Sequence, residues 1–156
     1  MATDALLRHE IYPGKDTLVI QRRARRGAAG IPKDTEIRIK IPSTFHHFVM
    51  NLPATAIDFL GSFIGLYHGH ESYFEPITKT KLPMIHAHCF STKSEDNVKE
   101  AKDICQRISD KLGYQVKPDD KEMVIHEVRD VAPNKRMFCA SFRLPAEVAF
   151  RQRHSK

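Results

Sequence analysis

The sequence of 156 residues lacks several patterns that would fix a compartment or a membrane topology. No run of about 18 or more consecutive apolar residues is present, which predicts that no helix spans a membrane. Residues 1–10 have neither a secretory apolar core nor the Arg-rich, acid-poor composition of a transit peptide. Only three cysteines occur, Cys89, Cys105 and Cys139, and each lies within an apolar pattern. We therefore expect an intracellular protein with reduced core cysteines and no membrane partner.

Motifs for metal binding and for dinucleotide binding are absent from the sequence as well. No two histidines or cysteines have the Cys-x-x-Cys or His-x-x-x-His spacing typical of zinc sites, so we expect no metal. His86 and His88 alternate within an apolar segment, which favours one face of a buried strand with hydrogen-bonded imidazoles. No glycine-rich turn follows a predicted strand, so the first half of a doubly wound fold is not visible.

The composition that is present is that of one globular domain with a basic charge. Apolar residues make up 41% of the chain and charged residues 28%, and the length suffices for one domain with a core. The formal net charge of +6 favours an anionic partner, with a nucleic acid as the natural candidate. Four positive charges form the cluster Arg22, Arg23, Arg25 and Arg26, which we predict to bind RNA; a solvated basic loop is the alternative.

Strand and helix patterns alternate through most of the chain and predict an α/β fold. Residues 36–41 alternate charge with Ile, which indicates a half-buried strand. Later strands are predicted at 45–50, 84–90, 123–131 and 136–144. One helix should begin near Ala54, and a second should run from the N-cap candidate Ser94 to Gly113.

This order of elements predicts parallel strands with a terminal antiparallel hairpin. Strand–helix alternation calls for parallel pairing, and the short connection between the last two strands predicts the hairpin at one edge. We expect the second half of a doubly wound sheet, with strand 45–50 central and covered on both faces. Three parts follow: a basic, poorly ordered segment 1–36, a partial α/β domain 37–145 and a polar tail 146–156. Half of such a sheet should expose an apolar edge, so we expect self-association through that edge.

Asn51 occupies the position where chemistry is expected in such a fold. The apolar strand 45–50 ends at this residue, and ligands of open α/β sheets bind beyond the carboxyl ends of strands. Its carboxamide has two donors and an acceptor, enough to read the edge of a planar ring. Pro53 follows two positions later and stiffens the turn, because proline fixes φ and has no N–H. An ordinary turn is the alternative interpretation.

Four stretches of the sequence resemble one enzyme family. The residues are 46–53 with Asn51-Leu52-Pro53, then 85–90, 126–133 and 137–145. In this order they are similar to motifs of the eukaryotic and archaeal tRNA (guanine(37)-N(1))-methyltransferases, across about residues 37–145. A sister family that makes wybutosine precursors has an extra residue inside the Asn-Pro step, which is not found here.

The resemblance implies a fold, a reaction and its participants. These are a class I, Rossmann-like methyltransferase sheet, S-adenosylmethionine as methyl donor, and as acceptor the guanine 3′ of the tRNA anticodon. It also implies that Asn51 and Pro53 line the reaction centre, with Asn51 also touching the cofactor. In the family the glycine-rich loop, the catalytic carboxylate and the tRNA-docking domain precede the Asn-Leu-Pro motif. This chain therefore resembles the C-terminal part of such an enzyme and is expected to be inactive alone, in the cytoplasm, nucleus or mitochondrial matrix.

Two further interpretations complete the predictions. Lys135 and Arg136 lie in the connection of the predicted hairpin, and their charge makes them candidate RNA contacts; a solvated loop is the alternative. The Asn-Leu-Pro stretch is also similar to the Asp/Asn-Pro-Pro-aromatic motif of amino-group methyltransferases, but Ala54 replaces the stacking aromatic. The competing function is a non-catalytic α/β module for RNA binding or assembly that uses the Arg22–Arg26 cluster.

Overall fold

The computed structural model describes residues 17–23, 34–42, 44–75, 81–90, 96–133 and 135–152. The chain divides into two units, Met1–Phe45 and His46–Lys156, and each is described by itself. A boundary between two parts of the chain is predicted after residue 36, but this position lies within a strand of the first unit, Asp34–Lys40. None of the described helices is long and apolar enough to cross a membrane.

The first unit contains a two-stranded antiparallel hairpin of β1 (Thr17–Arg23) and β2 (Asp34–Lys40). Leu18 pairs with Ile39 and Ile20 with Ile37, so these four side chains share one face of the hairpin. All four are exposed, by 38% to 50%. The half-burial predicted for residues 36–41 is therefore not found at residues 36–40, because no second layer covers this face within the described part of the unit.

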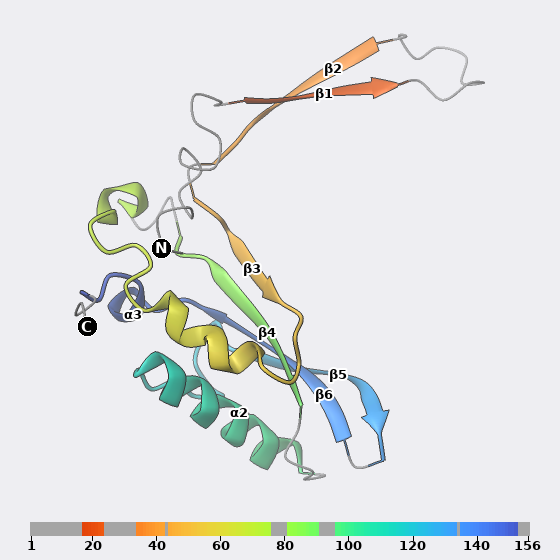
Figure 1. The fold of residues 1–156 in the computed structure, drawn as a ribbon, viewed down its shortest axis with the longest axis vertical. Helices are drawn as coiled ribbons and strands as arrows, with labels where there is room; N and C mark the ends of the chain where they lie inside the picture. The colour runs from red at the N-terminus through yellow and green to blue at the C-terminus, as the bar shows by residue number, and fades with distance from the viewer. Residues whose placement is uncertain are drawn as a thin grey trace. The chain divides into compact units, whose positions relative to one another are not determined.

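The second unit is built on a four-stranded sheet in the order β3-β4-β6-β5 (Figure 1). Its strands are β3 (His47–Met50), β4 (Met84–Phe90), β5 (Val124–Ala132) and β6 (Lys135–Arg143). β3 and β4 are parallel, while β6 runs antiparallel to both β4 and β5. The predicted parallel pair and the predicted antiparallel hairpin at one edge are both confirmed.

β3 is an edge strand, so the prediction that residues 45–50 form a covered central strand is wrong for this sheet. It pairs with β4 on one side and with no described strand on the other. Val49 at its centre is 69% exposed. A continuous apolar run shows that a strand needs cover on both faces, but it does not show which residues supply that cover.

The helices of the second unit lie on one side of the sheet (Figure 1). The segment predicted to be α-helical after Ala54 is a 3₁₀ helix, η2 (Ala56–Phe63), whose apolar side chains are buried. The expected α-helix does not continue past Phe63, because Ile64 is extended and Gly65 has a positive φ of 67°. Glycines at positions 61 and 65 also disfavour a regular α-helix here.

The second helix, α2 (Asn97–Leu112), has a cap at each end. Asp96, not the predicted Ser94, is the N-cap, and its carboxylate accepts a hydrogen bond from Val98 N at 2.9 Å. Gly113 ends the helix with φ 56°, as predicted.

The core lies between this sheet and the helices. Alternate side chains of β4 and β6 face the helices and are buried: Ile85, Ala87, Cys89, Phe138, Ala140 and Phe142. Two short helices complete this layer, η3 (Glu71–Phe74) and α3 (Ala146–Ala149). Val148 and Ala149 are fully buried, so this part of the predicted polar tail belongs to the core. Val148 O and Ala149 O accept hydrogen bonds from Gly65 N and Tyr67 N at 2.8 and 2.9 Å.

Candidate active site

Asn51 follows directly on β3, at the carboxyl edge of the parallel pair β3 and β4. Because Met50 pairs with Ala87, the register places Asn51 beside His88. Leu52 O accepts hydrogen bonds from Thr55 N and Ala56 N at 2.9 and 2.7 Å, which turns the chain from β3 into η2. The Asn51 side chain is exposed and has no hydrogen bond to any described residue. The predicted position of this carboxamide at a strand end is therefore found.

Pro53 lines a cavity of about 300 Å³ between η2 and α2. Arg107, on α2, lies in the same cavity and joins two elements of the site. Its Nη2 donates to Phe90 O at 3.1 Å, and its Nε donates to Asp103 Oδ2 at 2.6 Å. This ties the last carbonyl of β4 to α2 and fixes the edge beside which Asn51 lies.

Lys135 and Arg136, the two predicted RNA contacts of the hairpin, lie at the start of β6, and their surroundings differ. Arg136 Nη1 donates to Asn97 Oδ1 at 2.6 Å and to Glu127 Oε2 at 3.0 Å, and the side chain is only 17% exposed. Its guanidinium therefore joins the hairpin to α2, and this argues against a phosphate contact for Arg136. Lys135 is exposed, and its Nζ lies 3.9 Å from the centroid of the Phe90 ring.

The arginine cluster can be placed only in part. Arg22 and Arg23 lie near the end of β1, in register with Thr35 and Asp34. Arg25 and Arg26 lie outside the described residues. The prediction that this cluster binds RNA therefore remains a prediction.

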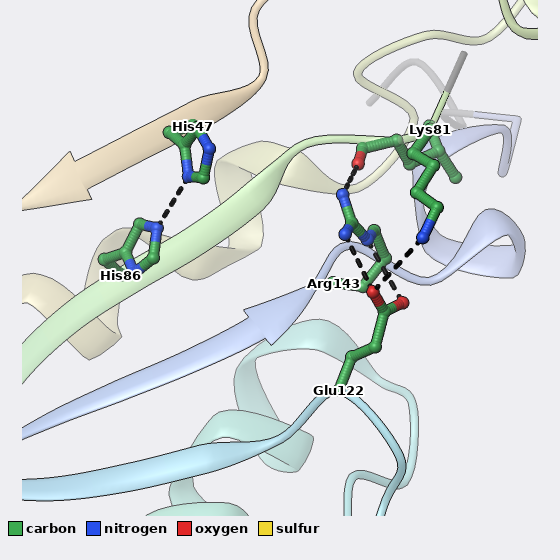
Figure 2. A network of polar contacts seen from close by, with 6 residues as sticks. His47, Lys81, His86, Glu122 and Arg143 are labelled. Atoms are coloured by element: carbon green, nitrogen blue, oxygen red, sulfur yellow. Dashed lines mark hydrogen bonds and ion pairs between the residues drawn. The ribbon is translucent and has the colours of Figure 1, made fainter. Parts of the chain in front are cut away.

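A second polar group occupies the middle of the sheet, on the face turned away from α2 (Figure 2). His47 Nδ1 and His86 Nε2 are 2.9 Å apart, and His86 Nδ1 lies 2.8 Å from Ser141 Oγ. Burial, together with the neighbouring His47 and His88, lowers the pKa of His86, so it is neutral at neutral pH. His88 differs from the predicted hydrogen-bonded imidazole, because its buried Nδ1 has no partner among the described residues.

No three histidine, cysteine or acidic side chains of the described segments are close enough to hold a metal ion. Burial raises the pKa values of Cys89 and Cys105 to about 11, so both thiols are protonated and unreactive at neutral pH.

Another cavity lies at the opposite edge of the sheet from Asn51 and does not belong to this site. It measures about 430 Å³ and is bordered by the end of β6, Leu82 and the segment after α2. Arg143, which pairs with the first residue of β4, donates there to Glu122 and to Leu82 O, and Lys81 lies nearby (Figure 2).

Phe90 and Arg107 were not predicted from the sequence. Phe90 ends a predicted strand and could have been found as a strand-end aromatic residue. Arg107 lies in the middle of an amphipathic helix, and no local pattern distinguishes it from a solvated arginine.

Sequence comparison finds related proteins that match most of this chain. A tRNA (guanine(37)-N(1))-methyltransferase of Fusarium vanettenii is 56% identical over 136 residues, covering 85% of this chain and 29% of that protein. The chain is a relative of the tRNA (guanine(37)-N(1))-methyltransferases. Proteins of that name from Ajellomyces capsulatus and Neurospora crassa are 53% and 48% identical and cover 91% and 97% of the chain.

The resemblance predicted from the Asn-Leu-Pro stretch is confirmed by these matches to tRNA (guanine(37)-N(1))-methyltransferases. The chain spans about a third of the length of these curated relatives, 32% in the case of the Neurospora crassa protein. No protein-family model matches the chain, and no solved structure matches it.

Proposed function

We propose that this chain forms part of an enzyme that methylates N1 of guanine 37 in tRNA, with S-adenosylmethionine as methyl donor. One observation carries the proposal. The region shared with the tRNA (guanine(37)-N(1))-methyltransferases has an exposed carboxamide, that of Asn51, at the carboxyl edge of parallel strands. Ligands of open α/β sheets bind at this edge. The sheet is accordingly proposed to be the C-terminal half of a Rossmann-like methyltransferase domain.

Asn51 positions the acceptor base and does not remove its proton. Guanine N1 carries a proton that must be lost before N1 attacks a methyl group, and a carboxamide is not a base. The carboxamide can instead hydrogen-bond the edge of the base and hold N1 in line with the methyl group. S-adenosylmethionine, when bound, supplies that methyl group as an electrophile.

The described residues fit one side of such a site. Asn51 contributes an unpaired polar group, and Pro53 contributes a rigid turn without a backbone donor. Neither β3 nor β4 is followed by a glycine-rich turn in the sequence, so this chain does not supply the rest of a cofactor cleft. For this reason we expect no methyl transfer by the chain alone.

The proposal is tested by grafting. This chain replaces the matched segment of the Fusarium vanettenii relative, and single-turnover methylation of tRNA is measured with the graft. We expect methylation by the graft and none by the isolated chain. Asn51→Ala should slow the graft about tenfold to a hundredfold, since a lost hydrogen bond of this kind is worth about 1–3 kcal/mol.

Controls separate chemistry from folding and binding. The affinity for tRNA should not change in Asn51→Ala, because it rests mainly on phosphate contacts. Gln106→Ala removes an exposed carboxamide on α2, which bonds Asp110 at 2.8 Å, and should leave the rate unchanged. If Asn51→Ala lowers only the melting temperature and leaves the rate intact, Asn51 is a turn-forming residue and the proposed site is wrong.

A further inference from the structure

Phe90 and Lys135 form a pair at the same edge of the sheet as Asn51. Phe90 is the last residue of β4, and Lys135 is the first residue of β6, which runs antiparallel beside it. The ammonium lies 3.9 Å from the ring centroid, within the range of a cation–π contact. The Phe90 ring is half-buried, whereas the Lys135 side chain is exposed.

Lys135 is available for a phosphate in a way that Arg136 is not. Arg136 is held by Asn97 and Glu127. No described carboxylate lies within ion-pair distance of Lys135, and its described partner is the ring of Phe90. An ammonium over an aromatic ring keeps most of its N–H donors free, so the Lys135 side chain can leave the ring and donate to a stronger acceptor such as a phosphate.

The backbone at Phe90 is held in place independently of the lysine. Arg107 donates to Phe90 O and is itself paired with Asp103, so the end of β4 is anchored to α2. The position from which the ring projects therefore does not depend on the ammonium. An aromatic side chain beside an exposed cation is a combination that binds unpaired nucleotides, with the base on the ring and the phosphate on the cation.

We propose that Phe90 and Lys135 form an RNA subsite that works by exchange, a proposal that rests on the proposed tRNA substrate. In the free protein the ammonium covers the ring. When RNA binds, an unstacked base of the substrate stacks on the Phe90 ring, and a neighbouring phosphate forms an ion pair with the Lys135 ammonium. The exchange is favourable because an exposed ammonium–ring contact is weaker than stacking of a base on the same ring.

The test measures binding of a fluorescent anticodon stem-loop RNA to the 156-residue chain at several salt concentrations. Lys135→Gln should weaken binding and reduce the slope of log K against log salt by about 0.7, the value of one phosphate contact on a single strand. Phe90→Leu keeps an apolar side chain but removes the ring, and should weaken binding about tenfold with the slope unchanged. Lys102→Gln on α2 and Phe59→Leu on η2 are exposed matched controls and should have no effect.

The double variant distinguishes exchange from a contact that persists in the complex. If the ammonium leaves the ring on binding, Lys135→Gln should weaken binding about twofold to fivefold more in the Phe90→Leu background than in the original chain. The reason is that in that background no cation–π contact is lost when RNA binds. A smaller effect in the Phe90→Leu background would mean that the pair stays together on the RNA, and the exchange would be refuted.

Other outcomes overturn the subsite itself. It is wrong if the unaltered chain does not bind the RNA, or if neither variant changes binding. The proposed function is tested separately by the graft. If the graft is active and both variants bind RNA as the original chain does, the subsite is refuted and the proposed function stands. If the variants weaken RNA binding but the graft is inactive, the proposed function is refuted and the subsite stands.

Discussion

The ion pair between Glu122 and Arg143 should make the stability of this chain depend on pH in a definite direction. Arg143 Nη2 lies 2.8 Å from Glu122 Oε1, and Nη1 donates to Leu82 O at 2.6 Å (Figure 2). The hydrogen bond from Arg143 lowers the pKa of the Glu122 carboxyl. A lowered folded-state pKa adds stability above the unfolded-state pKa of about 4.3, and this stability is lost as the pH falls through the folded-state pKa.

The two halves of this network should contribute differently to the free energy of unfolding. The side chains of Glu122 and Arg143 are 40% and 26% exposed, so solvent screens the ion pair and we assign it about 0.5–1 kcal/mol. The bond from the guanidinium to Leu82 O is half-buried and should contribute about 1.5–3 kcal/mol. At neutral pH, Glu122→Gln should therefore lower the free energy of unfolding by about 0.5–1 kcal/mol, and Arg143→Met by about 2–4 kcal/mol.

Urea unfolding followed by far-ultraviolet circular dichroism measures both effects, since the chain has no tryptophan to report on unfolding. The difference between Glu122→Gln and the original chain should shrink as the pH is lowered from neutral to about 3, because protonation of Glu122 through its lowered pKa removes the ion pair. Arg143→Met should keep most of its deficit there, because Leu82 O still loses its donor. Glu147→Gln is the control for an exposed carboxylate in the same region. A Glu122→Gln deficit of equal size at both pH values would refute the electrostatic explanation.

Three further predictions test the helix caps and the sheet edge. Asp96→Ala should lower the free energy of unfolding by about 1 kcal/mol in the same assay, because two backbone N–H groups of α2 lose their acceptor, and an unchanged midpoint would contradict this cap. Gly113→Ala should also destabilise the chain, by about 1–2 kcal/mol, because φ is 56° and the new Cβ would lie 3.1 Å from Arg151 Nη1. Gly69→Ala is the control: φ there is 80° but no atom lies near the new Cβ, so its effect measures backbone strain without the contact to Arg151. Val49→Lys should reduce self-association in light scattering, because it places a charge on the exposed face of edge strand β3, and association that is unaffected by it must use another surface.

The local signals of the sequence were sufficient for much of this fold. Prolines and glycines mark where several predicted segments begin or end. β4 has the same bounds as the predicted strand 84–90, and Gly113 is the C-cap of α2, as predicted. The strands of the hairpin differ from their predicted bounds by one residue at each end. These features depend on periodicity and backbone preference, which neighbouring residues determine.

The remaining features depend on partners far apart in the chain. Arg136 was predicted to face RNA, but its acceptor Asn97 lies 39 residues away, and no local pattern reveals such a pair. Arg107 reaches Phe90 O across 17 residues for the same reason. The edge position of β3 depends on which strands are present beside it, and an apolar sequence cannot report that. Asn51 was found because a strand end is a local feature, whereas its role awaits the graft.

The order of strands in the sheet has a consequence for how the chain folds during synthesis. β6 lies between β4 and β5, so it joins two strands that leave the ribosome before it. Until residues 135–143 have emerged, β5 lacks the one described strand that pairs with it, and the side of β4 that β6 later occupies offers unpaired backbone groups. The sheet therefore closes in a late step, and a nascent chain stalled before Lys135 should be a target for chaperones.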